Sequence, residues 1–85
     1  MILFYTTSLL IFPRPQFLIL ASDGLWDTFS NEEAVAYIRD HLNEPHFGAK
    51  SITLQSYARG SVDNISTIVI VFNNGDYKIG SSDSN

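Results

Sequence analysis

The chain contains no cysteine, so neither a disulfide nor a thiolate metal site can stabilise it. Basic residues are scarce: five Lys and Arg against nine Asp and Glu give a net charge of −4. This balance, without any basic cluster, argues against broad nucleic-acid binding. The two histidines, His41 and His46, have no second ligand at a usable spacing, so we expect surface residues there and not metal ligands.

Long hydrophobic runs are also missing. Residues 1–12 are mostly apolar, but they fall short of the ~20 residues that a membrane-spanning helix needs. They lack the basic start and the small-residue cleavage site of a signal peptide. This segment, which ends at a Pro-Arg-Pro sequence, is either a strand of a larger sheet or unrelated sequence joined in front of a domain. We favour the second interpretation and place the boundary after residue 16.

What is present is typical of a small globular domain. The 85 residues are 45% hydrophobic and 16% charged, a composition that favours folding over disorder. The length allows one domain at most. A chain of this size buries only about 60% of the surface that its unfolded state exposes, so its stability is marginal.

The most informative stretch is residues 17–27, FLILASDGLWD. Its apolar half predicts a buried strand. The Asp23-Gly24 step then predicts a sharp turn, because glycine accepts backbone angles that other residues resist. A carboxylate at the end of a buried strand is held rigidly and still reaches solvent, which suits a metal ligand. The alternative is that Asp23 only caps the turn, as in most Asp-Gly pairs.

Two helices are expected next. Ser30 and Glu33 form a capping-box pattern, which predicts a helix over residues 31–43 with its apolar side chains at helical spacing. A second helix is expected over residues 49–59, where Gly60 would end it.

The remaining sequence predicts strands and a tail. Residues 65–72 are rich in β-branched side chains and predict a second buried strand. Residues 77–79 could add a short strand. Residues 74–85 form a polar tail that we expect to be disordered from residue 80 onward.

The resulting order is strand, helix, helix, strand. Because the helices lead away and back, the second strand can run antiparallel to the first. This topology would bring Asp23 and Asp63, 40 positions apart (63 minus 23), to one edge of one sheet. Two carboxylates in close approach repel each other unless a cation lies between them. Oxygen ligands completed by water suit Mg²⁺ or Mn²⁺.

Two blocks resemble motifs of the PP2C-type (PPM) metal-dependent protein serine/threonine phosphatases. Residues 20–27 resemble the SDGLWD block, and residues 59–66, RGSVDNIS, resemble the RGSxDNI block. The likeness covers residues 17–73, which would be the C-terminal part of a PP2C-like phosphatase domain. It implies an α+β fold, a partial PP2C-like antiparallel β-sandwich with flanking helices.

The resemblance also implies chemistry. In the family, two Mg²⁺ or Mn²⁺ ions bind a bridging water that attacks phosphoserine or phosphothreonine of a phosphoprotein substrate. Asp23 and Asp63 match two carboxylate ligands of one metal.

The neighbouring positions match supporting roles. Gly24 would let the turn form, and Asn64 would help to fix the neighbouring carboxylate. Trp26 and Asp27 match structural positions, a packed indole and a turn or cap carboxylate.

Several family motifs do not occur in this sequence. They are the acidic pair after an early arginine motif, the DGHGG block with its bridging Asp, the GDSR and SRSLGD blocks, and the phosphate-contacting arginine. We therefore expect a truncated product that holds at most a weak partial metal site and is inactive alone. The alternatives are a non-catalytic interaction or dominant-negative fragment that pairs through an exposed sheet edge, and an unstable fragment without function. We expect a cytoplasmic location without membrane contact, although a similar member of the family is membrane-anchored.

Overall fold

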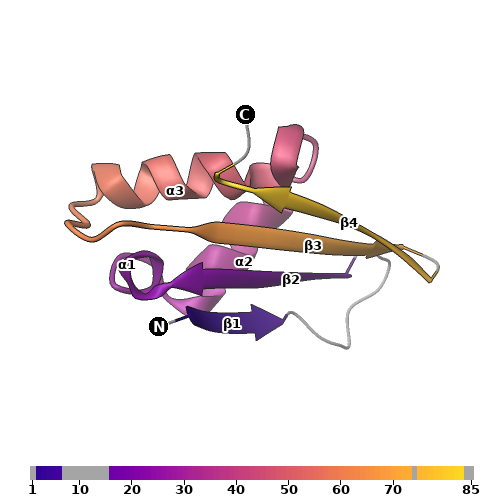
Figure 1. Cartoon of the computed structure of the whole chain (residues 1–85), viewed down its shortest axis with the longest axis horizontal. Helices are drawn as coiled ribbons and strands as arrows, with labels where there is room; N and C mark the ends of the chain where they lie inside the picture. The colour runs from indigo at the N-terminus through magenta and orange to yellow at the C-terminus, as the bar shows by residue number, and fades with distance from the viewer. Residues whose placement is uncertain (1, 7–15, 74, 84–85) are drawn as a thin grey trace.

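The computed structural model describes residues 2–6, 16–73 and 75–83. Its elements, in chain order, are β1 (Ile2–Thr6), β2 (Gln16–Ser22), α1 (Asp23–Trp26), α2 (Asn31–Asp40), the 3₁₀ segment η1 (Pro45–Gly48), α3 (Ala49–Ala58), β3 (Thr67–Asn73) and β4 (Asp76–Ser81). The strands form one antiparallel sheet in the order β1-β2-β3-β4 (Figure 1). The expected α+β class is confirmed.

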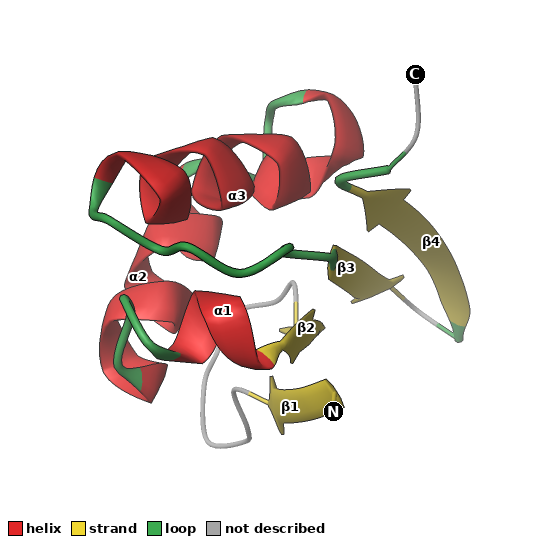
Figure 2. Cartoon of the chain, turned by 60° about the vertical axis from the view of Figure 1, so that its left-hand side comes forward, coloured by secondary structure: helices red, strands yellow, loops and turns green. Residues whose placement is uncertain are grey.

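The helices cover one face of this sheet. Figure 2 shows the strands on one side of the molecule and α1, α2 and α3 on the other. Alternate residues of β2 and β3 point toward the helices, because successive side chains of a strand face opposite ways. Together with helical side chains they form one core. Its fully buried members include Ile19 and Val69 from the sheet and Leu25, Ile38 and Ile52 from the helical layer.

The predicted antiparallel pairing of the two buried strands is confirmed. β2 pairs with β3 from Gln16 opposite Phe72 to Ala21 opposite Thr67. The end of β2 and the start of β3 therefore lie at the same edge of the sheet. This edge is where Asp23 and Asp63 were expected to meet.

The capping box of α2 is also confirmed. The Glu33 N–H donates to Ser30 Oγ (3.1 Å), and the Ser30 N–H donates to Glu33 Oε1 (3.0 Å). The helix ends at Asp40 and not at residue 43, because His41 leaves helical geometry (φ −119°) and a turn follows. α3 ends at Ala58, within a residue of the prediction. None of the helices in the described ranges is long and apolar enough to cross a membrane.

Both ends of the chain contribute a strand. Residues 2–6 belong to the segment that we expected to be unrelated sequence in front of the domain, and they pair with β2 as β1. Residues 7–15 lie outside the described part of the chain. Strand β4 occupies residues 76–81, so the strand suggested over residues 77–79 is longer than expected and takes up half of the expected polar tail. Residues 84–85 lie outside the described residues.

The segment η1 has an unusual backbone. His46 (φ 61°), Phe47 (φ 56°) and Gly48 (φ 86°) follow one another in the left-handed region. That conformation costs roughly 1–2 kcal/mol for a residue with a side chain. Packing offsets the cost, because Phe47 lies against the core and η1 presses on β4 at Gly80. A Cβ at Gly80 would lie 2.3 Å from the His46 carbonyl oxygen, so only glycine fits there.

This contact predicts the effect of replacing Gly80 with alanine. The added methyl group would collide with the backbone of η1, so the Gly80→Ala chain should lose about 1–3 kcal/mol in free energy of unfolding, as overpacked positions do. Urea unfolding followed by Trp26 fluorescence measures the loss. The control is Lys78→Ala at an exposed position of the same strand, where we expect a change within about 0.5 kcal/mol. Equal stabilities of the two variants would contradict the close packing.

Candidate functional site

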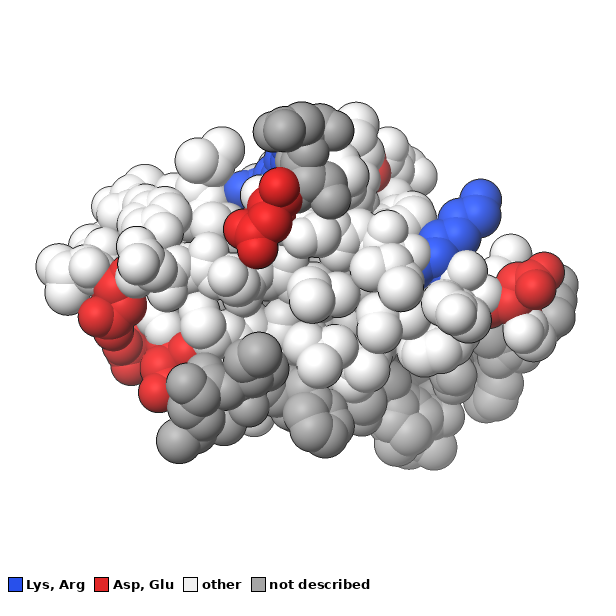
Figure 3. All heavy atoms as spheres, viewed as in Figure 1, with Lys and Arg blue, Asp and Glu red and all other residues white. Residues whose placement is uncertain are grey.

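The candidate site lies where β2 runs into α1. Asp23 is the first residue of α1 and is half-buried, whereas Asp63 is exposed in the loop of residues 61–66 before β3. The expected turn at Asp23 is therefore a short helix, which begins at that residue. Figure 3 shows acidic side chains gathered at the end of the molecule that α1 and this loop occupy.

Ser22 joins the two segments. Its N–H donates to the Ser66 carbonyl oxygen (3.0 Å), and its hydroxyl accepts from the Ser66 N–H (3.1 Å). The same hydroxyl donates to the Asn64 carbonyl oxygen (3.3 Å). These three bonds extend the pairing of β2 and β3 by one step beyond the ladder. They fix the backbone on the C-terminal side of Asp63 relative to the start of α1.

Gly24 allows the loop to approach α1 closely. A Cβ at this position would lie 2.9 Å from Ile65 Cγ1, 3.1 Å from Ser61 Oγ and 3.3 Å from Asp63 Cβ. Gly24 is buried and helical, and it is not among the residues with positive φ. Its role is thus close approach, and the backbone freedom expected from an Asp-Gly turn is not used.

The oxygen atoms at this edge suit a hard divalent cation. Asp23 and the Cβ of Asp63 flank Gly24, which brings both carboxylates to one edge. Beside them, Ser61 Oγ is buried and has no hydrogen-bond partner among the described residues. Carboxylate and hydroxyl oxygens with water are typical Mg²⁺ ligands. However, the described residues contain no group of three or more Asp, Glu or His side chains that could hold a metal. At this edge the described residues thus provide the carboxylates of Asp23 and Asp63 and the hydroxyl of Ser61.

Comparison with known proteins identifies the family. The model of the Protein phosphatase 2C family matches residues 5–65, more than half of the chain. The chain belongs to the protein phosphatase 2C family. Members of this family are generally metal-dependent, and the family implies phosphoprotein substrates.

Individual PP2C relatives are much longer than this chain. It is 67% identical to Protein phosphatase 1L from Bos taurus over 72% of the chain, which is 17% of the length of that relative. It is 51% identical to Probable protein phosphatase 2C 59 from Arabidopsis thaliana over 82% of the chain, 22% of that protein. A Protein kinase and PP2C-like domain-containing protein from Oryza sativa subsp. japonica shares 47% identity over 71% of the chain and 9% of its own length. No solved structure matches the chain.

The other PP2C motif positions have structural contacts. The half-buried Trp26 packs against the core, and its indole N–H donates to the Ala21 carbonyl oxygen (3.2 Å). Asp27 is exposed at the C-terminal cap of α1, where its N–H donates to the Asp23 carbonyl oxygen (3.0 Å). Asn64 contributes its main-chain carbonyl to Ser22, and no hydrogen bond links its side chain to Asp63 among the described residues.

A set of hydroxyl groups beneath the site was missed by sequence reasoning. Ser56 is fully buried on α3, and its hydroxyl donates to the Gly24 carbonyl oxygen (3.3 Å) and bonds to the Thr28 hydroxyl. Tyr57 Oη accepts from the Ile65 N–H (3.0 Å). Together these groups hold α1 and the loop of residues 61–66 on α3. A serine within an apolar helix face is the only sequence signal for them.

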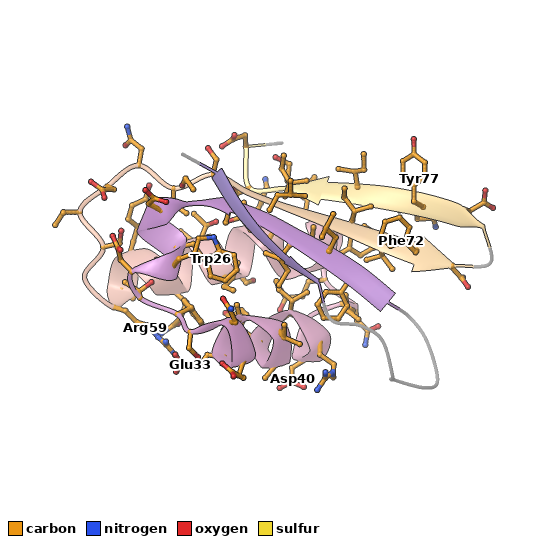
Figure 4. All side chains as sticks on the ribbon, turned by 90° about the horizontal axis from the view of Figure 1, so that it is seen from below. Trp26, Glu33, Asp40, Arg59, Phe72 and Tyr77 are labelled. Atoms are coloured by element: carbon orange, nitrogen blue, oxygen red, sulfur yellow. The ribbon has the colours of Figure 1, made fainter. Side chains whose placement is uncertain are left out.

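Arg59, the first residue of the RGSxDNI-like block, fastens the end of α3 to the start of α2. Its Nη1 donates to the Thr28 carbonyl oxygen (2.8 Å) and to Glu33 Oε2 (3.3 Å), and its guanidinium lies 3.9 Å from the centre of the Phe29 ring. Figure 4 shows Arg59 and Glu33 side by side at the helical side of the molecule. This arginine is therefore a structural residue.

Both histidines are partly buried, so the expectation of simple surface residues was incomplete. The His41 ring stacks on Tyr37 with ring centres 4.0 Å apart, and its Nδ1 lies 2.6 Å from the Tyr37 carbonyl oxygen. His46 Nδ1 accepts from the Ser81 N–H (3.4 Å).

A hollow of about 440 Å³ lies at the other end of β3, away from the candidate site. Its lining includes Leu42 and Phe47 from the helical layer and Val71 and Tyr77 from the sheet. The hollow lies at the C-terminal end of β3, whereas Asp63 precedes the start of that strand. The hollow is therefore not part of the candidate site at Asp23 and Asp63.

Glu33 predicts a pH dependence of stability. The hydrogen bond from the Ser30 N–H has the largest effect on the pKa of the Glu33 carboxyl. Together with the charge of Arg59, it holds this pKa below its ordinary value of 4.5. A lowered pKa in the folded chain contributes stability above the unfolded pKa, and this contribution is lost as the pH falls through the folded pKa. We expect Glu33→Gln to be less stable than the natural chain near neutral pH, with the difference shrinking as the pH falls below the ordinary carboxyl pKa of 4.5 and through the lowered pKa of Glu33. Urea unfolding at several pH values measures it.

Glu32→Gln is the matched control, because Glu32 is exposed in the same first turn of α2. It retains the capping box and the Arg59 pair. A pH-independent difference for Glu33→Gln, or an equal effect of Glu32→Gln, would contradict the assignment.

Proposed function

We propose that this chain supplies Asp23 and Asp63 as two carboxylate ligands of one metal ion in a metal-dependent protein serine/threonine phosphatase. The observation that carries the proposal is the packing of Asp63 Cβ against Gly24, next to Asp23. Membership of the PP2C family supports it. The substrates are phosphoserine and phosphothreonine side chains of phosphoproteins.

The chain's own residues position the ligands. Ser22 fixes the loop backbone, and Ser56 holds the Gly24 carbonyl from below. The backbone that carries each carboxylate is therefore held in place, and a cation shared by the two carboxylates would offset their mutual repulsion. A divalent ion bound there would lower the pKa of a bound water and stabilise charge on the phosphoryl group.

We further propose that the chain alone does not catalyse hydrolysis. The sequence contains no DGHGG block, the source of the carboxylate that bridges both metals in the family. It corresponds to 17% of the length of one PP2C relative and 22% of another. Two carboxylates hold Mg²⁺ weakly, because tight sites use more ligands.

Titration with Mg²⁺ tests the ligand assignment. In two-dimensional amide NMR spectra of the chain, millimolar Mg²⁺ should shift signals of residues 22–24 and 62–64 while the rest of the spectrum stays unchanged. Asp23→Asn and Asp63→Asn should each abolish these shifts, because a single carboxylate cannot retain the ion.

Two further variants sharpen this experiment. Gly24→Ala keeps both carboxylates but pushes the loop away from α1, so it should weaken the Mg²⁺ response as well. Asp40→Asn removes the same charge on α2, far from the site, and should leave the response intact. If Asp40→Asn reduces the shifts as much as Asp23→Asn, the response reflects net charge and the assignment fails.

A second experiment tests the inactivity of the chain alone. With p-nitrophenyl phosphate and Mn²⁺, we expect hydrolysis no faster than in buffer, because the bridging carboxylate is missing. Metal-dependent hydrolysis that disappears in Asp23→Asn would overturn this expectation. The second candidate function is a non-catalytic module that pairs with another chain. The outer strands β1 and β4 favour that function, because each pairs along one side only.

A further inference from the structure

The hydroxyl of Ser61 is a buried polar group that the fold leaves unpaired. Its Oγ is shielded from solvent, and it has no hydrogen-bond partner among the described residues. An unpaired buried donor costs free energy, so such groups are rare in folded proteins. Where one occurs, it often marks a position at which a water, an ion or a functional partner belongs.

The position of this hydroxyl is fixed through Ser56 of α3. The Ser61 N–H donates to the Ser56 carbonyl oxygen (3.1 Å), and the Ser56 hydroxyl donates to the Gly24 carbonyl oxygen (3.3 Å). One residue of α3 thus holds both the loop of residues 61–66 and the start of α1. The Ser61 hydroxyl hydrogen can still rotate toward an acceptor that comes near.

The Asp63 side chain starts from a point close to this hydroxyl. A Cβ on Gly24 would lie 3.1 Å from Ser61 Oγ and 3.3 Å from Asp63 Cβ, so both atoms cover the same spot on α1. Asp63 is exposed, and its carboxylate can turn about the Cα–Cβ bond between staggered orientations. Its orientation therefore depends on what it contacts.

We propose that Ser61 is a positioning residue, whose hydroxyl donates a hydrogen bond to the Asp63 carboxylate when that carboxylate binds the divalent ion. The inference rests on the proposed function, which makes Asp63 a ligand. Carboxylate ligands of metal ions are commonly held by a hydrogen bond from a second residue. This bond pairs the buried hydroxyl and selects one orientation of the ligand.

Ser61 suits this role better than Asn64 does. The resemblance to PP2C motifs implied that Asn64 helps to fix the neighbouring carboxylate. However, Asn64 is exposed, and its contribution to the loop is a main-chain carbonyl that accepts from Ser22. An exposed amide exchanges its hydrogen bonds with water, whereas the buried Ser61 hydroxyl gains a bond that water does not supply.

Magnesium titration of Ser61→Ala, followed by amide NMR of the full chain, tests the proposal. The dissociation constant read from the signals of residues 22–24 should rise about 10-fold, as it does when a residue that orients a ligand is removed. With Mg²⁺ bound, the Hβ couplings of Asp63 should report a single rotamer in the natural chain and rotational averaging in Ser61→Ala. The control is Val62→Ala, because Val62 is 95% exposed in the same loop, and it should bind Mg²⁺ as the natural chain does.

Stability without metal separates this role from a purely structural one. Ser61→Ala removes a hydroxyl that has no partner, so its urea midpoint in the absence of Mg²⁺ should equal or exceed that of the natural chain. A lower midpoint would show that the hydroxyl stabilises the metal-free loop, and the proposal would be overturned.

The outcomes distinguish this proposal from the ligand assignment. A natural chain that gives no Mg²⁺ response overturns both. A natural response that Ser61→Ala retains at full affinity overturns the role of Ser61 alone. Weaker binding by Ser61→Ala with Asp63 still in a single rotamer also overturns it and indicates that the hydroxyl contacts the ion itself. Weaker binding by Asn64→Ala but not by Ser61→Ala assigns the role to Asn64 instead.

Discussion

The antiparallel pairing of β2 with β3 is the contact on which the rest of the structure depends. It joins segments that are far apart in the chain and aligns the last residue of β2 with the loop before β3. Ser22 extends the alignment with three hydrogen bonds, and Gly24 admits Asp63 to the start of α1. The same pairing also constrains α1, α2 and α3, because the segment that contains these helices must begin at the end of β2 and finish at the start of β3.

Much of the arrangement could be predicted because its signals are local. The apolar run before Asp23 and the β-branched run after Asn64 identify the paired strands, and the capping box locates the start of α2. The meeting of Asp23 and Asp63 then follows from topology alone. Its assignment to a metal remains a prediction, since the described residues contain no group of three or more His, Asp or Glu side chains that could hold one.

Other features could not be predicted because they exist only in the assembled fold. The left-handed backbone at His46 and Phe47 is unfavourable by itself and is held by packing against Gly80. The sequence around Gly80 resembles a polar tail, yet pairing with β3 makes it a strand. Likewise, the role of Ser56 depends on the position of Gly24, which lies 32 residues earlier in the chain.

The same β2–β3 pairing has a consequence for how the chain folds. Ala21 pairs with Thr67, so two residues that lie 46 positions apart in the chain (67 minus 21) must come together before β2 and β3 can pair. Non-local pairings of this kind slow folding, because chain entropy is lost before the contact is gained. During synthesis, β2 emerges from the ribosome well before β3 does. The apolar residues of β2 then remain unpaired with β3 for the whole of that interval, and we expect them to be open to contact with other chains.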